Sequence, residues 1–183
     1  MLPPMSVAHE GGIFASCSLE RGSPEEPILR SLNDRVITQF ELEQGVSHTE
    51  FIRGKHDGEF YFLETAARVG GAHIADLVEA ASGINLWTEW AKVASASKTK
   101  PYRLPERRKD YAGLIITLAR QENPDTTGYD DPEIVWRLNK RHHAGLIVRS
   151  LQWERVNTLI ESYAERFRAD FHASMPLPDQ PSD

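Results

Sequence analysis

Cysteine, basic charge and long hydrophobic runs are all scarce in this sequence. Among its 183 residues Cys17 is the single cysteine, which excludes an intramolecular disulfide and favours a small strand residue over a nucleophile. No apolar stretch approaches the length of about 20 residues that a membrane helix needs, and the N-terminus lacks the basic and apolar segments of a secretion signal. We therefore expect a cytoplasmic protein with no membrane partner.

The excess of basic residues that marks nucleic-acid-binding proteins is also lacking. The chain has 21 Lys and Arg residues against 27 Asp and Glu residues, a formal net charge of −6 at pH 7. Basic residues do gather locally, at Arg103, Arg107, Arg108 and Lys109. Such a short run is more typical of a solvated face or a phosphate contact than of a DNA site, so no nucleic-acid partner is expected.

Several common catalytic signatures are missing as well. There is no GxxxxGK phosphate loop, no GxSxG nucleophile motif, no cysteine-based zinc pattern and no GxGxxG dinucleotide motif. His142 and His143 would point to opposite faces of a strand, so a metal ion shared between them is not expected. The content of 40% hydrophobic and 26% charged residues is that of an ordinary globular protein with one or two compact units.

What the chain does have is a patterned stretch from Gly45 to Gly71. It reads as a strand, a turn at His56 to Gly58, a second strand and a glycine turn before a helix, because side chains alternate on either side of the turn residues. Strict alternation places Phe62 on the same face as Glu64. Counted outward from the turn, Glu50 and Glu64 are expected to lie near each other across the two strands.

Two facing carboxylates repel each other unless a cation lies between them. Mg²⁺ takes one or two carboxylates and completes its coordination with water and substrate phosphates. Arg68 and the pair Gly70-Gly71 follow directly, and a guanidinium and accessible backbone amides both suit an anion. Each feature alone has a plain alternative, solvated acids on a strand or an ordinary turn before a helix. In this order they favour a phosphate bound through a metal ion.

Three segments of this stretch carry a family resemblance: HTEF at 48–51, GEFYFLE at 58–64 and ETAARVGG at 64–71. They resemble the C-terminal half of the ATP-grasp superfamily, closest to its L-amino-acid ligase or carboxylate-amine ligase branch. In that fold, two acidic residues on neighbouring antiparallel strands hold Mg²⁺ between the phosphates of ATP.

The resemblance assigns roles to residues of this chain. It implies that Glu50 and Glu64 bind Mg²⁺ or Mn²⁺ and that Arg68 is catalytic, facing an acyl-phosphate intermediate. Contacts to phosphate or substrate are expected from Gly70, Gly71, His48, His9 and Glu10; for the last two, a surface turn is the alternative. One departure is Ala66, where many ATP-grasp enzymes have Asn, although the ligase branch also has a small residue there.

The predicted fold class is α+β, an antiparallel sheet covered by helices and followed by a small unit of three strands and one helix. A leading loop is expected at 1–12, the ATP-grasp subdomain at 13–98, a linker at 99–110, the small domain at 111–172 and a disordered tail at 173–183. In the small domain, strands are expected at 111–119, 134–138 and 143–148, and a helix at 153–171.

Local signals give the remaining helices. Ser23 is expected to cap a helix through a capping box with Glu26, and this helix should lay one apolar face on a sheet. A helix over 73–81 should bury Ile74, Leu77 and Val78 and end at Gly83, and Asn85 should cap a helix over 86–96. Trp87 and Trp90 on that helix are interpreted as core anchors.

The expected activity follows from the resemblance. ATP would phosphorylate a small carboxylate substrate, and an amine would then attack the acyl phosphate. The ligase branch makes amino acids a candidate class of substrate. Other ATP-grasp branches, such as biotin-carboxylase-like or peptide-modifying ligases, stay open, as does the identity of both substrates.

No segment before Ile13 supplies the adenine pocket, the glycine-rich loop and the phosphate-binding lysines of an ATP-grasp enzyme. The chain is therefore expected to be a fragment or separately encoded remnant that needs an N-terminal half as its partner. The alternative is a non-catalytic module, in which an exposed sheet edge and apolar surface recruit a partner or form a homo-oligomer.

Overall fold

A computed structural model describes residues 12–97 and 99–173 of the chain. The chain divides into two compact units, one formed by residues 19–109 and the other by the residues up to Ser18 together with those from Asp110 onward. Antiparallel sheets and helices make up both units, so the predicted α+β class is confirmed. The predicted disordered tail lies outside the described residues, apart from Ala173.

A four-stranded antiparallel sheet forms the centre of the second unit. Its strand order is β1-β4-β6-β5, with β1 at Phe14–Cys17, β4 at Tyr111–Leu118, β6 at His143–Ser150 and β5 at Ile134–Arg137. The sequence predicted three strands here and placed residues 13–18 with the hairpin. That placement was wrong, because β1 pairs with β4 from Phe14 opposite Ile116 to Cys17 opposite Gly113.

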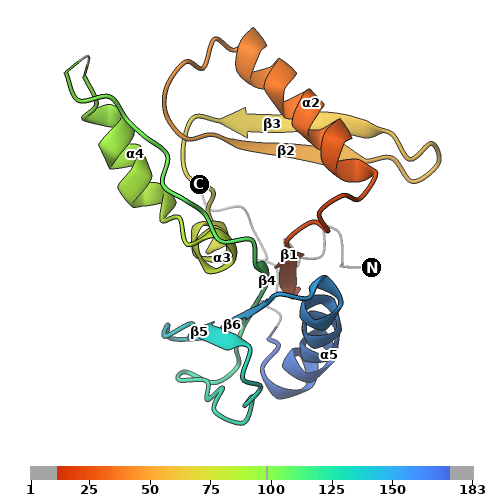
Figure 1. Cartoon of the computed structure of the whole chain (residues 1–183). Helices are drawn as coiled ribbons and strands as arrows, with labels where there is room; N and C mark the ends of the chain where they lie inside the picture. The colour runs from red at the N-terminus through yellow and green to blue at the C-terminus, as the bar shows by residue number, and fades with distance from the viewer. Residues whose placement is uncertain (1–11, 98, 174–183) are drawn as a thin grey trace, which may run out of the picture. The chain divides into compact units, whose positions relative to one another are not determined.

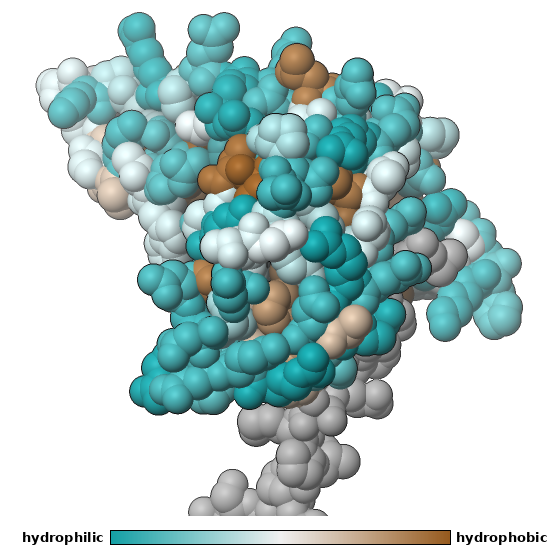
Figure 2. Space-filling view, turned by 90° about the horizontal axis from the view of Figure 1, so that it is seen from below, coloured by the Kyte–Doolittle hydropathy of each residue, from teal (hydrophilic) through white to brown (hydrophobic). Residues whose placement is uncertain are grey.

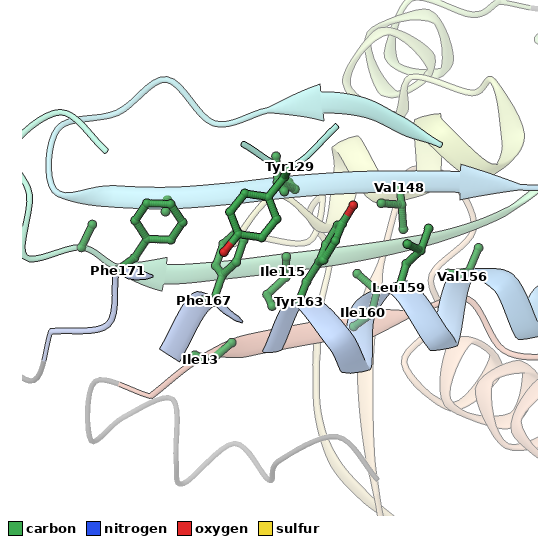
Figure 3. Close-up of a cluster of buried hydrophobic side chains, with 13 residues drawn as sticks. Ile13, Ile115, Tyr129, Val148, Val156, Leu159, Ile160, Tyr163, Phe167 and Phe171 are labelled. Carbon is green, nitrogen blue, oxygen red and sulfur yellow. The ribbon is translucent and has the colours of Figure 1, made fainter. Parts of the chain in front are cut away.

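The helix α5 (Trp153–Asp170) packs on this sheet and completes its core. Its buried stripe includes Val156, Ile160, Tyr163 and Phe167, as the helical spacing predicts. Figure 3 shows these side chains facing Ile115 and other residues of the sheet, with the rings of the cluster side by side. Gly113 on β4 lies directly beneath the helix, where an added Cβ would overlap Ile160.

The loop between β4 and β5 is tied to α5 by an ion-pair network. Arg155 donates to Glu133 over 2.8 and 3.0 Å and to Asp131 over 2.9 Å. The hydroxyl of Tyr163 donates to the other oxygen of Asp131 over 2.5 Å. Charge-assisted hydrogen bonds of this kind are stronger than neutral ones, so the network fixes a turn-rich loop that has little secondary structure of its own.

In the first unit, a two-stranded hairpin joins β2 (His48–Arg53) to β3 (Phe60–Ala66), and α2 (Glu25–Gln39) lies across one of its faces (Figure 1). Phe62 contacts both Phe51 and Phe40, with ring centroids 6.2 and 6.3 Å apart. No residue of α2 is fully buried, however, and Phe40 is 58% exposed. The expected apolar helix face is therefore only partly covered by the hairpin.

The start of α2 differs from the predicted capping box. Pro24 takes the N-cap position, and the hydroxyl of Ser23 makes no capping bond. Glu26 does reach back, accepting a hydrogen bond of 2.7 Å from the backbone amide of Gly22 and another from Arg30. The predicted box therefore does not form. Glu26 accepts from the amide of Gly22 in place of that of Ser23, and the helix begins one residue later than a Ser23 cap requires.

Two short helices follow the hairpin, α3 (Ile74–Ser82) and α4 (Leu86–Ala94). Gly83 closes α3 in the left-handed conformation, and the side chain of Asn85 accepts from the Thr88 amide over 2.9 Å, so both predicted caps are confirmed. In α3, Leu77 is buried as expected, Ala75 is the second buried residue, and Ile74 and Val78 are only partly buried.

Arg108, one of the predicted basic cluster, supports the end of α3. Its guanidinium donates to the carbonyls of Glu79 and Ala80, both over 3.1 Å, and its backbone amide donates to Ser82 over 2.7 Å. The bonds to Ala80 and Ser82 reach carbonyls of the last turn of the helix, and the carbonyl of Glu79 accepts from the Gly83 amide as well. Arg108 therefore has a structural role.

The interpretation of both tryptophans as core anchors was wrong for one of them. Trp87 is 57% exposed, although its ring lies 6.0 Å from that of the half-buried Trp90.

In the described part of the chain, no helix has the length and apolar character needed to cross a membrane. On the face drawn in Figure 2, hydrophilic residues predominate and hydrophobic ones form small separate areas.

Candidate functional site

The hairpin brings the two predicted acidic residues together. Glu50 on β2 and Glu64 on β3 are direct partners in the antiparallel register, so the predicted pairing is confirmed. Directly opposed residues of two antiparallel strands project their side chains to the same face. Glu50 is partly covered, with its side chain 26% exposed, whereas Glu64 is exposed. Both carboxylates are thus within reach of solvent and of a ligand.

A β-bulge next to this pair corrects the expected alternation. Glu64 lies opposite Glu50 but Phe62 lies opposite Phe51, so the register shifts and Leu63 has no partner. Phe62 therefore packs toward α2, on the face opposite to that of Glu64. Bulges often occur beside active sites, where they re-aim a side chain. The run of large apolar residues from 60 to 63 gave no signal of the bulge.

His48 lies on the same face as the two acids. Its partner across the hairpin is Ala66, the position where many ATP-grasp enzymes have Asn. The imidazole Nδ1 is 3.7 Å from Oε1 of Glu50, which is too long for a hydrogen bond and short enough for an ion pair when the ring is protonated. With its side chain 20% exposed, His48 is the more buried member of this pair.

Arg68 lies just beyond the second acid and is exposed. Its Nη1 donates to the carbonyl of Val69 over 3.0 Å. Among the described residues, no ion pair joins Arg68 to either Glu50 or Glu64. The guanidinium is thus held near the turn by one backbone carbonyl and is not neutralised by the neighbouring acids.

The glycine turn connects Arg68 to the N-terminus of α3. Gly70 is buried, and its neighbour Val69 is 1% exposed, so the first half of the turn is fixed in the interior. Ala72 and His73 then both adopt the left-handed conformation, with φ of 48° and 61°, which is costly for residues with a Cβ. Nδ1 of His73 and Oδ2 of Asp76 are 2.8 Å apart in the first turn of the helix.

A hard divalent cation fits the donor set on this face better than a soft one, because carboxylate oxygens are the ligands that Mg²⁺ and Mn²⁺ prefer. Within residues 12–97 and 99–173, no group of three or more His, Cys, Asp or Glu side chains is gathered around one point. A cation bound to the Glu50 and Glu64 pair would therefore need ligands from outside these side chains, such as water or phosphate oxygens.

Two other observations delimit the site. The predicted contacts His9 and Glu10 lie outside the described residues. A hollow of about 570 Å³ elsewhere in the same unit is lined by residues that include Glu43, Val93 and Tyr102, and none of the predicted site residues lines it. The acidic pair is separate from this hollow, and its member Glu64 lies exposed on the hairpin.

Comparisons with known proteins extend this picture. No protein-family profile and no curated protein sequence matches the chain. Its structure is similar to that of an L-amino acid ligase from Bacillus licheniformis, with a TM-score of 0.63 and 15% identity over 90% of this chain and 44% of the ligase. It is also similar to a phosphoribosylglycinamide synthetase from Anaerococcus prevotii, with a TM-score of 0.56 and 13% identity over 88% of this chain and 45% of the synthetase.

Both of these proteins are ATP-grasp enzymes. At such low identity the likeness establishes the fold, and at that level the predicted resemblance is confirmed. The chain spans less than half the length of either protein.

Proposed function

We propose that this chain, which has the fold of part of an ATP-grasp enzyme, binds ATP and Mg²⁺ for a carboxylate-amine ligase. Its substrates would be a small carboxylate and an amine, with amino acids as the first class to test. The observation that carries this proposal is the direct pairing of Glu50 and Glu64 on one open face of the hairpin. Two such carboxylates repel each other, and a cation bound between them stabilises both negative charges.

The residues beyond the pair support a triphosphate ligand. Arg68 offers a guanidinium that suits phosphate oxygens in a bidentate arrangement. Gly70 and Gly71 bring backbone to the N-terminal end of α3, where amide groups and the helix dipole favour an anion. A bound Mg²⁺ would supply charge neutralisation of the phosphates. The carboxylates of Glu50 and Glu64 would hold the triphosphate through that charge, and Arg68 would bind it directly.

The reaction proposed for the whole enzyme has two steps. A carboxylate oxygen of the first substrate attacks the γ-phosphorus of ATP, the bond to the β-phosphate oxygen breaks, and ADP leaves. The amine then attacks the carbonyl carbon of the acyl phosphate, and inorganic phosphate leaves with the formation of an amide and loss of a proton. Phosphoryl transfer of this kind depends mainly on positioning and charge stabilisation, which is the role that we assign to Arg68.

The adenine-binding residues are assigned to another part of the ATP-grasp fold. The match leaves more than half of each neighbouring enzyme outside the region shared with this chain. We propose that this other part, as a partner half of the site, supplies the adenine pocket and additional phosphate contacts.

The first test measures metal and nucleotide binding by the acidic pair. Isothermal titration of the full chain with Mn²⁺ and with Mn²⁺-ATP is expected to detect binding that Glu64→Gln and Glu50→Gln each weaken by at least roughly 10-fold, the smallest loss usual when even an outer-shell residue of a metal site is changed. Glu59→Gln is the matched control, since Glu59 lies exposed in the same hairpin and its loss removes the same charge.

Equal losses in all three variants would assign the binding to net charge and would overturn the proposed site. Binding by the wild-type chain that neither Glu64→Gln nor Glu50→Gln alters would do the same. Amino-acid-dependent hydrolysis of ATP, lost in Glu64→Gln and kept in Glu59→Gln, would establish the ligase activity itself.

The alternative, a non-catalytic module that associates with a partner or with itself, is favoured by one observation. Large apolar side chains of the hairpin are about half exposed, with Ile52 at 52%, Tyr61 at 54% and Leu63 at 49%. Exposed apolar residues that are neighbours on a surface often mark an interaction site. Light scattering, which measures the molar mass, and the Mn²⁺-ATP titration together distinguish the two functions. A stable dimer that binds no Mn²⁺-ATP supports the module, and a monomer that binds Mn²⁺-ATP supports the ligase.

A further inference from the structure

His48 lies between the acidic pair and the glycine turn. On one side its Nδ1 is 3.7 Å from Oε1 of Glu50. On the other side its ring lies against Gly70, so closely that a Cβ added there would be 3.1 Å from Cδ2 and 3.4 Å from Cγ of the ring. One side chain thus touches both parts of the proposed phosphate site, the strand that carries Glu50 and the turn that follows Arg68.

Space, and not backbone conformation, is what makes glycine necessary at position 70. Gly70 does not have the positive φ that favours glycine, whereas Gly58 and Gly83 in the same unit do. Carbon atoms in good contact are about 3.5–4.0 Å apart, so the distances that a Cβ would have at Gly70 are shorter than a comfortable contact. Gly70 therefore allows the imidazole ring to lie directly on the backbone of the turn.

The second neighbour of that added Cβ cannot easily move away. It is Cγ2 of Ile74, at 3.2 Å. This methyl group is bonded directly to the β-carbon of a β-branched residue, whose χ1 is stiff in a helix, and Ile74 is the first residue of α3. The ring of His48 can rotate more freely, because the final torsion of a histidine side chain has broad minima. Any crowding at Gly70 is thus relieved mainly by a movement of His48.

From this geometry we propose that His48 is a positioning residue that links the glycine turn to the Glu50 carboxylate. The inference rests on the proposed function, because it assigns a role to His48 within the same site. The ring keeps Glu50 in the orientation that faces Glu64, and the position of the ring is set by Gly70. A phosphate group that draws the turn toward itself would also act on Glu50 through the ring, so that phosphate and cation bind cooperatively.

The test is a double-mutant cycle between Gly70 and His48, with Mn²⁺ affinity measured by titration calorimetry on the full chain. Gly70→Ala is expected to weaken Mn²⁺ binding roughly 10-fold, as is usual when a residue that orients a metal ligand is disturbed. In the His48→Ala background the same Gly70→Ala change is expected to have almost no effect, because the ring through which it acts is gone.

Gly128→Ala is the control. A Cβ at Gly128 would meet nothing within 4 Å, and Gly128 has no positive φ either. Gly128 lies outside the proposed site, so this variant is expected to keep the wild-type affinity for Mn²⁺. The ring signals of His48 in ¹⁵N-labelled protein without metal give a second readout. They are expected to shift in Gly70→Ala and to stay in place in Gly128→Ala.

Three results would overturn the inference while leaving the proposed function intact. They are equal Mn²⁺ affinities in Gly70→Ala and Gly128→Ala, the same loss from Gly70→Ala with and without His48, and His48 ring signals that Gly70→Ala leaves in place. A wild-type chain that binds Mn²⁺ neither alone nor together with ATP would instead overturn the proposed function. The proposed role of His48 would then be overturned as well.

A variant series at His48 keeps the proposal testable if Gly70→Ala does not fold. His48→Asn keeps a planar polar side chain on the turn and is expected to retain more Mn²⁺ affinity than His48→Ala. Wild-type affinity in His48→Ala, with circular dichroism unchanged, would show that Glu50 needs no support from His48 and would contradict the assignment.

Discussion

Cys17 on β1 is an example of a side chain whose chemistry is set by its surroundings. Burial, with a smaller contribution from the negative charge of Glu161, raises the pKa of the Cys17 thiol to about 11. At neutral pH the group is therefore a thiol, and the thiolate is the form that acts as a nucleophile or metal ligand. This agrees with the interpretation of Cys17 as a small strand residue.

Arg155 bonds two carboxylates of the second unit, Asp131 and Glu133. Hydrogen bonds from Tyr163 and Arg155 lower the pKa of Asp131, and the bond from Arg155 lowers the pKa of Glu133. A carboxyl group whose pKa is lower in the folded chain stabilises the fold above its ordinary pKa of about 4 and loses this contribution as the pH falls below it. Arg155→Gln is thus expected to move the midpoint of acid unfolding to higher pH.

Circular dichroism across a pH titration from 7 to 2 measures this midpoint. Arg168→Gln is the control, because Arg168 lies exposed on the same helix and carries the same charge. An equal change of the midpoint in both variants would assign the effect to net charge instead of to the network.

Among the elements, α5 and β4 meet at a contact that leaves no room for a side chain on the strand. A Cβ at Gly113 would be 2.9 Å from Cγ1 of Val156 and even closer to Ile160. Both partners are fully buried in the core shown in Figure 3, so neither can move out of the way. Gly113→Ala is therefore expected to lower the free energy of unfolding by about 1–3 kcal/mol, the usual cost of overpacking a core.

Urea denaturation of the two glycine variants checks this contact. Gly128→Ala is the control, since a Cβ at Gly128 would meet nothing within 4 Å and this residue has no positive φ. Its free energy of unfolding is expected to stay within about 0.5 kcal/mol of the wild-type value or to rise slightly. A Gly113→Ala protein as stable as the wild type would show that α5 can shift along the sheet.

At the scale of the whole molecule, the described residues of the proposed site all belong to the unit of residues 19–109, whereas the large apolar core belongs to the other unit. Stability and ligand binding are thus assigned to different parts of the chain. Hydrogen exchange followed by mass spectrometry is expected to show slower exchange over residues 46–74 when Mg²⁺-ATP is added, and no change over 143–150. Protection confined to 143–150 would place the ligand on the other unit.

Features that depend on neighbouring residues in the sequence were predictable. The turn at His56 to Gly58 fixes the hairpin, with Gly58 at a φ of 73° and Asp57 accepting from the amide of Glu59. The turn brings Glu50 and Glu64 near each other, and the bulge then makes them direct partners, because the register from the turn would place Glu50 opposite Leu63. Gly83 and Asn85 end and begin their helices through bonds that span a few residues. In each case the residue type alone determines the local backbone conformation or hydrogen bond.

Features that depend on distant partners were not predictable from the pattern. Trp87 was expected in a core, yet its exposure depends on which elements pack against α4. The bulge at Leu63 breaks a regular alternation that the residues themselves do not interrupt.

The sequence by itself determined the hairpin and the helix caps, because turn and capping residues act over short distances along the chain. The direct pairing of Glu50 with Glu64 also required the bulge at Leu63. Only the tertiary structure decided that β1 joins β4, with Ser18 bonded to Ala112 across 94 residues, and that the ring of His48 lies on Gly70. Strand partners and packing contacts are chosen by the complementarity of whole surfaces, and that complementarity exists only once the chain has folded.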